Sequence, residues 1–60
     1  MKFKKGDHIK HELFDSKLEI LDINTNNYIL NNGEYYIYYV DDHCKLDLDY
    51  YRKEKIKKLL

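Results

Sequence analysis

Residues 28–40 read YILNNGEYYIYYV, and the fold prediction begins from this stretch. Asn32-Gly33 is typical of two-residue β-hairpin turns, because both residue types tolerate the positive φ of a type I′ turn. Apolar and aromatic residues flank the dipeptide over 28–30 and over 35–40. The second run is aromatic and β-branched throughout, a composition that is enriched in strands. The stretch therefore predicts a hairpin of two antiparallel strands, 28–30 and 35–40.

Two more strands are predicted before this hairpin. Ile9, His11 and Leu13 alternate with polar residues over 8–13, which is the period of a half-buried strand. Residues 18–23 carry apolar side chains on both faces, so we expect an interior strand there. Short stretches rich in Asn, Asp and Ser separate these segments and supply turn chemistry.

The pattern is weaker toward the C-terminus. Leu46, Leu48 and Tyr50 alternate with aspartates, which suits a short edge strand. Residues 51–60 are rich in helix formers and predict a short helix or a frayed tail, which needs docking because so short a helix is marginal in water. The whole chain thus predicts one mainly β domain, a small five-stranded antiparallel barrel over about 7–50 followed by a basic tail or helix.

Length and charge exclude several classes of protein. A chain of 60 residues allows one small domain and no large catalytic cleft. Its formal net charge is zero, whereas a dedicated nucleic-acid-binding protein usually has a positive excess. The two ends are basic and the middle is acidic. The single cysteine, Cys44, forms no internal disulfide, and no apolar run is long enough to span a membrane, so we expect a cytoplasmic protein.

The opening FKKGDHI at residues 3–9 resembles the entry of Src-homology-3-like, Tudor-like and KOW-like barrels. In that pattern an aromatic residue is followed, after two positions, by Gly-Asp and then by an aliphatic residue. The resemblance covers about residues 3–50, and the plan is also similar to uncharacterised small barrels of gut bacteria, phages and mobile elements. It implies a Src-homology-3-like binding module in which Gly6-Asp7 turns into the first strand and Phe3 plugs the end of the barrel.

The residues typical of metal sites and catalysis are poorly spaced for either role. His8 and His11 are three residues apart on a predicted strand, so they point to opposite faces. The chain has no cysteine or histidine pair with the spacing of a structural zinc site. Adjacent His43 and Cys44 could pair as base and nucleophile, but a barrel of this size offers little to exclude water. We expect no metal, no cofactor and no enzymatic activity.

The seven tyrosines are the strongest functional feature. Tyrosine offers a large amphipathic contact area and is enriched at interface cores, although the same residues could simply fill a core that has no tryptophan. The predicted partner-binding face comprises Tyr36, Tyr38, Asp41, Asp42, Tyr50 and Tyr51. We expect a protein partner there, and self-association through an open strand edge is a further mode of binding.

Lys, Asn, Ile and Tyr make up nearly half of the chain and are favoured by A/T-rich codons. This composition indicates a phage, mobile-element or low-GC bacterial gene, so the protein-binding hypothesis extends to an inhibitor or regulator of a host protein. The alternative is a single-stranded nucleic-acid-binding barrel that stacks bases on exposed tyrosines. Its predicted phosphate contacts are Lys4, Lys5, Arg52, Lys53 and Lys55. Acidic residues beside the tyrosines argue against that alternative.

Overall fold

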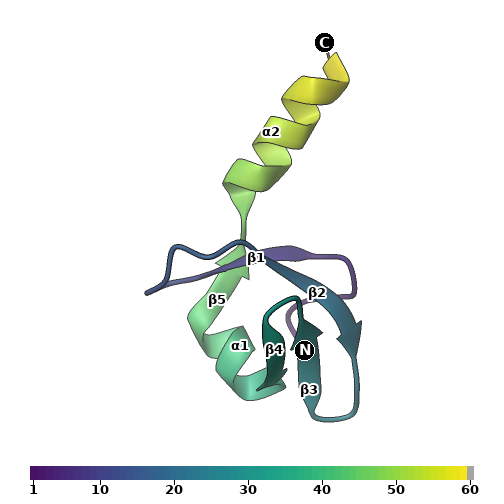
Figure 1. The fold of residues 1–60 in the computed structure, drawn as a ribbon, viewed down its shortest axis with the longest axis vertical. Coiled ribbons are helices and arrows are strands. Elements are labelled where there is room, and N and C mark those ends of the chain that lie inside the picture. Colours follow the sequence, from purple (N-terminus) through teal and green to yellow (C-terminus); the bar gives the residue numbers. More distant parts are fainter. Residues whose placement is uncertain (60) are drawn as a thin grey trace.

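The computed structural model of the chain describes residues 1–59. Five antiparallel strands form one sheet in the order β4-β3-β2-β1-β5 (Figure 1). In chain order the elements are β1 (His8–His11), β2 (Leu18–Ile23), β3 (Asn27–Leu30), β4 (Gly33–Tyr36), α1 (Ile37–His43), β5 (Cys44–Leu46) and α2 (Leu48–Leu59). The prediction of a small mainly β protein with five antiparallel strands and a C-terminal helix is confirmed. The sheet does not close, because β4 and β5 remain its two edges.

The core lies between the sheet and α1. Its buried hydrophobic residues are Phe3, Ile9, Leu18, Ile20, Tyr28, Leu30, Val40 and Cys44. Buried positions alternate along β1 and β3, as the period of a strand requires. His11 joins the core as predicted, but Leu13 is 76% exposed and lies beyond the end of β1. The His11 Nδ1 accepts the Leu13 amide at 3.0 Å, and this local bond accompanies the departure of the chain from the sheet.

The predicted β3–β4 hairpin is present, but its turn is not of type I′. No non-glycine residue among those described has a positive φ, so Asn31 and Asn32 cannot adopt that turn. Gly33 has a φ of +145°, in the region that favours glycine. Asn31 is held by β2, because its backbone amide donates to the Glu19 carbonyl and its side-chain amide donates to the Lys17 carbonyl.

The prediction of a strand over 35–40 is wrong beyond Tyr36. β4 ends there, at its last pairing with β3, and the chain turns into α1. Ile37 and Val40 are three residues apart, so a helix places both on one side, and that side packs against the core. Cys44, the residue that follows α1, is buried in the same cluster. Burial of Val40, which is only 1% exposed, outweighs the strand propensity of the aromatic run.

The predicted edge strand over 46–50 is displaced toward the N-terminus. β5 ends at Leu46, and α2 begins at Leu48, so Leu48 and Tyr50 are helical rather than extended. Asp47 explains this boundary. Its Oδ1 accepts the Tyr50 amide at 3.1 Å, which is the bond by which an aspartate caps the start of a helix.

α2 projects away from the sheet and gives the molecule an elongated outline of 40 × 22 × 19 Å (Figure 1). The predicted helix or tail over 51–60 is helical as far as Leu59, and residue 60 lies outside the described part of the chain. Within that described part, neither helix has the length and apolar character needed to cross a membrane.

Candidate functional site

The structure divides the predicted partner-binding face between two places. Tyr36, Tyr38 and Asp42 lie exposed where β4 meets α1. Tyr50 and Tyr51 belong to the first turn of α2, which leaves the sheet at its opposite end (Figure 1). The predicted residues therefore do not form one continuous surface.

Asp41, the remaining residue of that prediction, is bound within the fold. Its Oδ1 accepts the Tyr28 hydroxyl at 2.8 Å, and both of its carboxylate oxygens accept the Lys2 amide at 3.2 Å. The Tyr28 hydroxyl in turn accepts the Phe3 amide at 3.0 Å. Burial raises the pKa of the Tyr28 phenol, and the neighbouring Asp41 carboxylate raises it further. Asp41 thus ties the N-terminal segment and β3 to α1.

Tyr50 and Tyr51 attach α2 to β1. The Tyr50 ring stacks on the His8 imidazole with their centroids 3.6 Å apart and their planes 19° from parallel. The Tyr51 hydroxyl accepts the His8 amide at 3.0 Å. Desolvation by its neighbours raises the pKa of the Tyr50 phenol. Both tyrosines dock the helix, and a role for them in partner binding stays a prediction.

The exposed aromatic residues gather around α1. Tyr36 and Tyr38 are 69% and 82% exposed, and Tyr39 and Phe14 are also exposed. Phe14, Tyr39 and the half-buried Tyr35 line one small hollow beside α1. We call Phe14, Tyr35, Tyr36, Tyr38 and Tyr39 the α1 surface. The sequence prediction missed Phe14, Tyr35 and Tyr39. The separation of four residues between Tyr35 and Tyr39 would have placed them together had a helix been recognised here.

Tyr39 is held in place by a hydrogen bond to His11 of β1. The His11 Nδ1 accepts the Leu13 amide, so the ring proton lies on Nε2, which donates to the Tyr39 hydroxyl at 2.9 Å. The Tyr39 ring also lies 4.7 Å from the His43 ring, centroid to centroid. His43 contacts the Glu12 carboxylate at 2.8 Å, and this bond lowers the pKa of Glu12. These contacts hold the Tyr39 ring in one orientation.

Two hollows meet at the rings of Tyr35 and Tyr39. The smaller, of about 90 Å³, lies between α1 and the connection from β1 to β2, and Phe14, Leu18 and Val40 give it an apolar wall. The larger, of about 510 Å³, opens beside β4, and we call it the β4 hollow. The β4 hollow is lined by Asn27, Glu34, Tyr35, Tyr36 and Tyr39.

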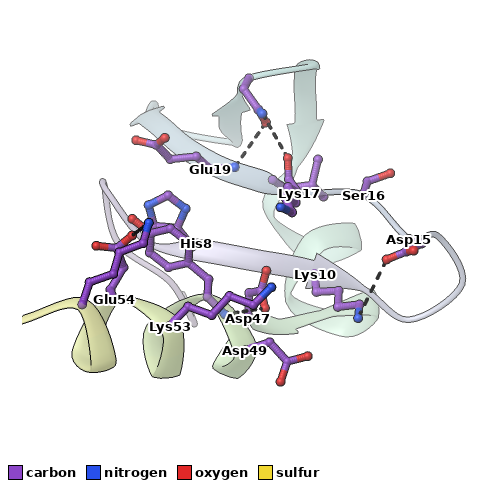
Figure 2. A pocket seen from close by; sticks show the side chains of 14 residues that line it. His8, Lys10, Asp15, Ser16, Lys17, Glu19, Asp47, Asp49, Lys53 and Glu54 are labelled. Atoms are coloured by element: carbon purple, nitrogen blue, oxygen red, sulfur yellow. Dashed lines mark hydrogen bonds and ion pairs between the residues drawn. The ribbon is translucent and has the colours of Figure 1, made fainter. Parts of the chain in front are cut away.

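A third hollow, of about 450 Å³, separates α2 from β1 and β2, and we call it the α2 groove (Figure 2). Figure 2 shows Lys53 of α2 close to Asp47, whereas Lys10 of β1 extends toward Asp15. The charged residues that line it are Lys10, Lys17, Lys53, Lys57, Asp15, Glu19, Asp47, Asp49 and Glu54. Because both signs alternate along the groove, it has no uniform positive field to hold a phosphate backbone.

The cations of the nucleic-acid alternative are dispersed among the described residues. Lys4 and Lys5 precede β1, whereas Arg52, Lys53 and Lys55 lie on α2. Lys53 is the only one of these five that lines the α2 groove. The Arg52 guanidinium lies 3.8 Å from an aspartate of the same helix, on its exposed surface.

His43 and Cys44 are not arranged as a base and a nucleophile. Cys44 is 5% exposed, and burial raises the pKa of its thiol, which favours the unreactive protonated form. The His43 Nδ1 is occupied by the Glu12 carboxylate. Over residues 1–59, no group of three or more His, Cys, Asp or Glu side chains could hold a metal ion.

No protein-family model, curated protein or solved structure matches this chain. Its function has to be inferred from its own surface.

Proposed function

We propose that this chain is a non-catalytic binding module that docks a protein partner through the α1 surface. The observation that carries the proposal is the exposure of Tyr36 and Tyr38, at 69% and 82%, of which Tyr36 lines the β4 hollow. A domain of this size has a thin core, so burying an aromatic ring would increase the stability of its fold. A ring that stays exposed to water makes no such contribution. Tyrosine is one of the residues that dominate binding energy at protein interfaces.

The position of Tyr36 supports the proposal. Tyr36 caps α1 with extended dihedral angles, φ −59° and ψ 139°, but its side chain makes no capping hydrogen bond. Serine, asparagine or aspartate would satisfy the helix better at such a position. A residue that breaks a local stability rule and remains exposed is typical of a functional site.

Fold and composition support two narrower parts of the same proposal. Five antiparallel strands, with a short helix between β4 and β5, are consistent with an open Src-homology-3-like small barrel. Leu30 of β3 and Cys44 of β5 belong to the same buried cluster although two strands separate them in the sheet. Nuclear Overhauser effects between these two side chains test the curvature, and a flat sheet would lack them. The A/T-favoured composition supports a phage or mobile-element product that regulates or inhibits a host protein, and the genomic position of its gene tests that origin.

The test of the docking surface is a pull-down with the full chain as bait. The variant Tyr36→Ser/Tyr38→Ser should lose the captured partner while its circular dichroism spectrum remains that of the folded protein. The matched control is Leu21→Ser/Ile56→Ser, which removes two side chains that are 46% and 56% exposed on β2 and α2. This control should capture the partner as the unaltered chain does.

Two results would contradict the proposal. If the tyrosine variant unfolds, its rings belong to the core and not to an interface. If both variants lose the partner equally, binding is general adhesion of exposed apolar side chains and does not depend on the α1 surface.

A further inference from the structure

β4 is an edge strand with unpaired backbone groups on its open side. It pairs only with β3, in the register that sets Tyr28 opposite Tyr35. The Ile37 amide donates to the Asn26 carbonyl at 3.0 Å. This bond determines which residues of β4 direct their backbone N–H and C=O toward β3 and which direct them toward the open edge. In an antiparallel pair every second residue turns its backbone N–H and C=O away from its partner strand. Those residues of β4 are Glu34 and Tyr36, so their amides face the open edge.

The β4 hollow runs along this same edge. Its lining combines two residues of the outward set, Glu34 and Tyr36, with the rings of Tyr35 and Tyr39. An incoming extended segment would therefore find backbone partners and an aromatic surface side by side. Added strands gain affinity from main-chain hydrogen bonds and specificity from such side-chain contacts.

One polar atom of the hollow lacks a partner. Among the described residues, Asn27 Oδ1 is the buried side-chain nitrogen or oxygen without a hydrogen bond. The orientation of its amide is fixed, because the Asn27 Nδ2 donates to the Glu34 carboxylate at 2.9 Å and a carboxylate can only accept. If the amide were flipped, the Asn27 Oδ1 would face the Glu34 carboxylate, and both of these groups are hydrogen-bond acceptors. The buried Oδ1 of Asn27, a residue that lines the hollow, thus lacks a hydrogen-bond donor.

Charge indicates what kind of donor fits. Glu34 accepts amides from Asn24 and Asn27, and it forms none of the ion pairs found among the described residues. No Lys or Arg lines the β4 hollow. A lysine or arginine side chain would supply both the missing donor and the missing positive charge, and such charge-assisted hydrogen bonds are the strong ones.

We infer that the partner presents an extended peptide segment carrying a lysine or arginine, which adds to β4 as a sixth strand of the sheet. The inference rests on the proposed function and names the class of partner that the α1 surface takes. The backbone of the segment pairs with Glu34 and Tyr36, its cationic side chain lies against Glu34 and Asn27, and its apolar side chains cover Tyr35 and Tyr39. The unpaired N–H and C=O groups of an uncovered sheet edge are a template for pairing with another chain.

The first experiment selects binders from a phage-displayed library of random linear peptides, with the immobilised full chain as the target. Selected sequences should share a Lys or Arg at one position and β-branched residues at alternating positions near it. The binding of a synthetic copy is then measured by fluorescence anisotropy. Glu34→Gln keeps the acceptor for Asn27 but loses the charge, so it should weaken binding about tenfold. Glu19→Gln, on β2, is the control and should have no effect.

The second experiment separates the backbone of Tyr36 from its side chain. Tyr36→Ala removes the ring only, whereas Tyr36→Pro also removes the outward amide. The native φ of −59° suits proline, and proline is tolerated where an edge-strand amide faces solvent, so both variants should fold. Strand addition predicts that Tyr36→Pro binds the peptide more weakly than Tyr36→Ala does. N-methylation of the paired peptide amide should likewise abolish binding.

The possible outcomes separate this inference from the proposed function. If Tyr36→Ala and Tyr36→Pro weaken peptide binding equally and N-methylation has no effect, strand addition is overturned while side-chain docking on the α1 surface stands. If no peptide is selected although the pull-down still depends on Tyr36 and Tyr38, the partner is not a linear segment. If the chain dimerises and Tyr36→Pro makes it monomeric, the occupant of the edge is a second copy, and the inference is again wrong.

Discussion

Tyr36 occupies a position where function and stability make opposite demands. It begins α1 without a side-chain capping bond, and its ring is largely exposed. Tyr36→Ser supplies an oxygen that can accept the amide of Tyr38 or Tyr39. We expect this substitution to raise the free energy of unfolding by about 0.5–1 kcal/mol while it weakens partner binding. Urea denaturation followed by circular dichroism measures the gain.

Tyr38→Ser is the matched control for that gain. Tyr38 is 82% exposed and lies in the first turn of α1, two residues after the capping position, so its replacement should change stability by less than about 0.5 kcal/mol. A Tyr36→Ser variant less stable than the unaltered chain would show that the Tyr36 ring packs on the fold, and the trade-off would not exist.

The buried hydroxyl of Tyr28 makes stability sensitive to alkaline pH. Burial raises the pKa of this phenol above its ordinary 10.0, and burial also raises the pKa of the Cys44 thiol above 9.0. The folded chain therefore holds both protons to higher pH than the unfolded chain does. The stability that depends on them is intact below the unfolded-state values and is lost as the pH rises toward the folded-state values. We expect the free energy of unfolding to fall from about pH 8.5 upward.

Tyr28→Phe tests the assignment to this residue. It leaves the Phe3 amide and the Asp41 carboxylate short of a partner, so it should cost about 1–3 kcal/mol at neutral pH. It should also flatten the alkaline decline, because one titrating group is gone. Tyr38→Phe alters a hydroxyl in solvent and should leave both quantities unchanged. An unaltered alkaline slope in Tyr28→Phe would assign the decline to other groups.

The start of α2 depends on a single aspartate. The Asp47 Oδ1 accepts the Tyr50 amide, and the same turn brings Tyr50 onto the His8 ring. Asp47→Ala should therefore cost about 0.5–2 kcal/mol and reduce the helical signal in circular dichroism. Asp15→Ala removes an exposed carboxylate with only a loose contact to Lys10, at 4.0 Å, and should be nearly neutral. Equal losses in both variants would mean that Asp47 acts through net charge rather than through capping.

Strands were predictable where a single period was present. The alternation that buries Ile9, Ile20 and Tyr28 is visible in the sequence, and so is the hairpin at Gly33. The turn type was not, because Asn31 takes its conformation from bonds to β2 that lie far away in the sequence. The residues of the β3–β4 turn predict that the chain reverses direction at this point, whereas the contacts of Asn31 with β2 determine the type of turn.

Residues 37–43 fit both the two-residue period of a strand and the 3.6-residue period of a helix. Read as a strand, the segment would set Tyr36, Tyr38 and Val40 on one face; as a helix, it buries Val40 and leaves Tyr38 in solvent. Composition favours the strand, and only the need to cover the core favours the helix. The candidate site was predictable to the same extent. Tyr36 and Tyr38 could be named as contacts, but their separation from Tyr50 and Tyr51 follows from a helix that local propensity did not indicate.

Charge of both signs is spread over the surface, and this bears on the nucleic-acid alternative. The net charge is zero, the α2 groove has both signs along its wall, and the β4 hollow is acidic. A phosphate backbone binds by releasing counterions to clustered cations, and that affinity is greatest at low salt. Lys4 and Lys5 are far in the sequence from Arg52, Lys53 and Lys55, and Lys53 alone of the five lines the α2 groove.

We therefore expect no measurable binding of single-stranded DNA or RNA at about 50 mM salt, where electrostatic affinity would be strongest. Fluorescence anisotropy with labelled homopolymers measures it. The positive control is the variant Asp47→Asn/Asp49→Asn/Glu54→Gln, which removes three negative charges from the wall of the α2 groove and should introduce weak, salt-sensitive binding. Tight binding by the unaltered chain that falls steeply with salt, and falls again in Lys53→Glu/Lys57→Glu, would make the α2 groove a nucleic-acid site. The binding surface of the protein would then be the α2 groove and not the acidic β4 edge.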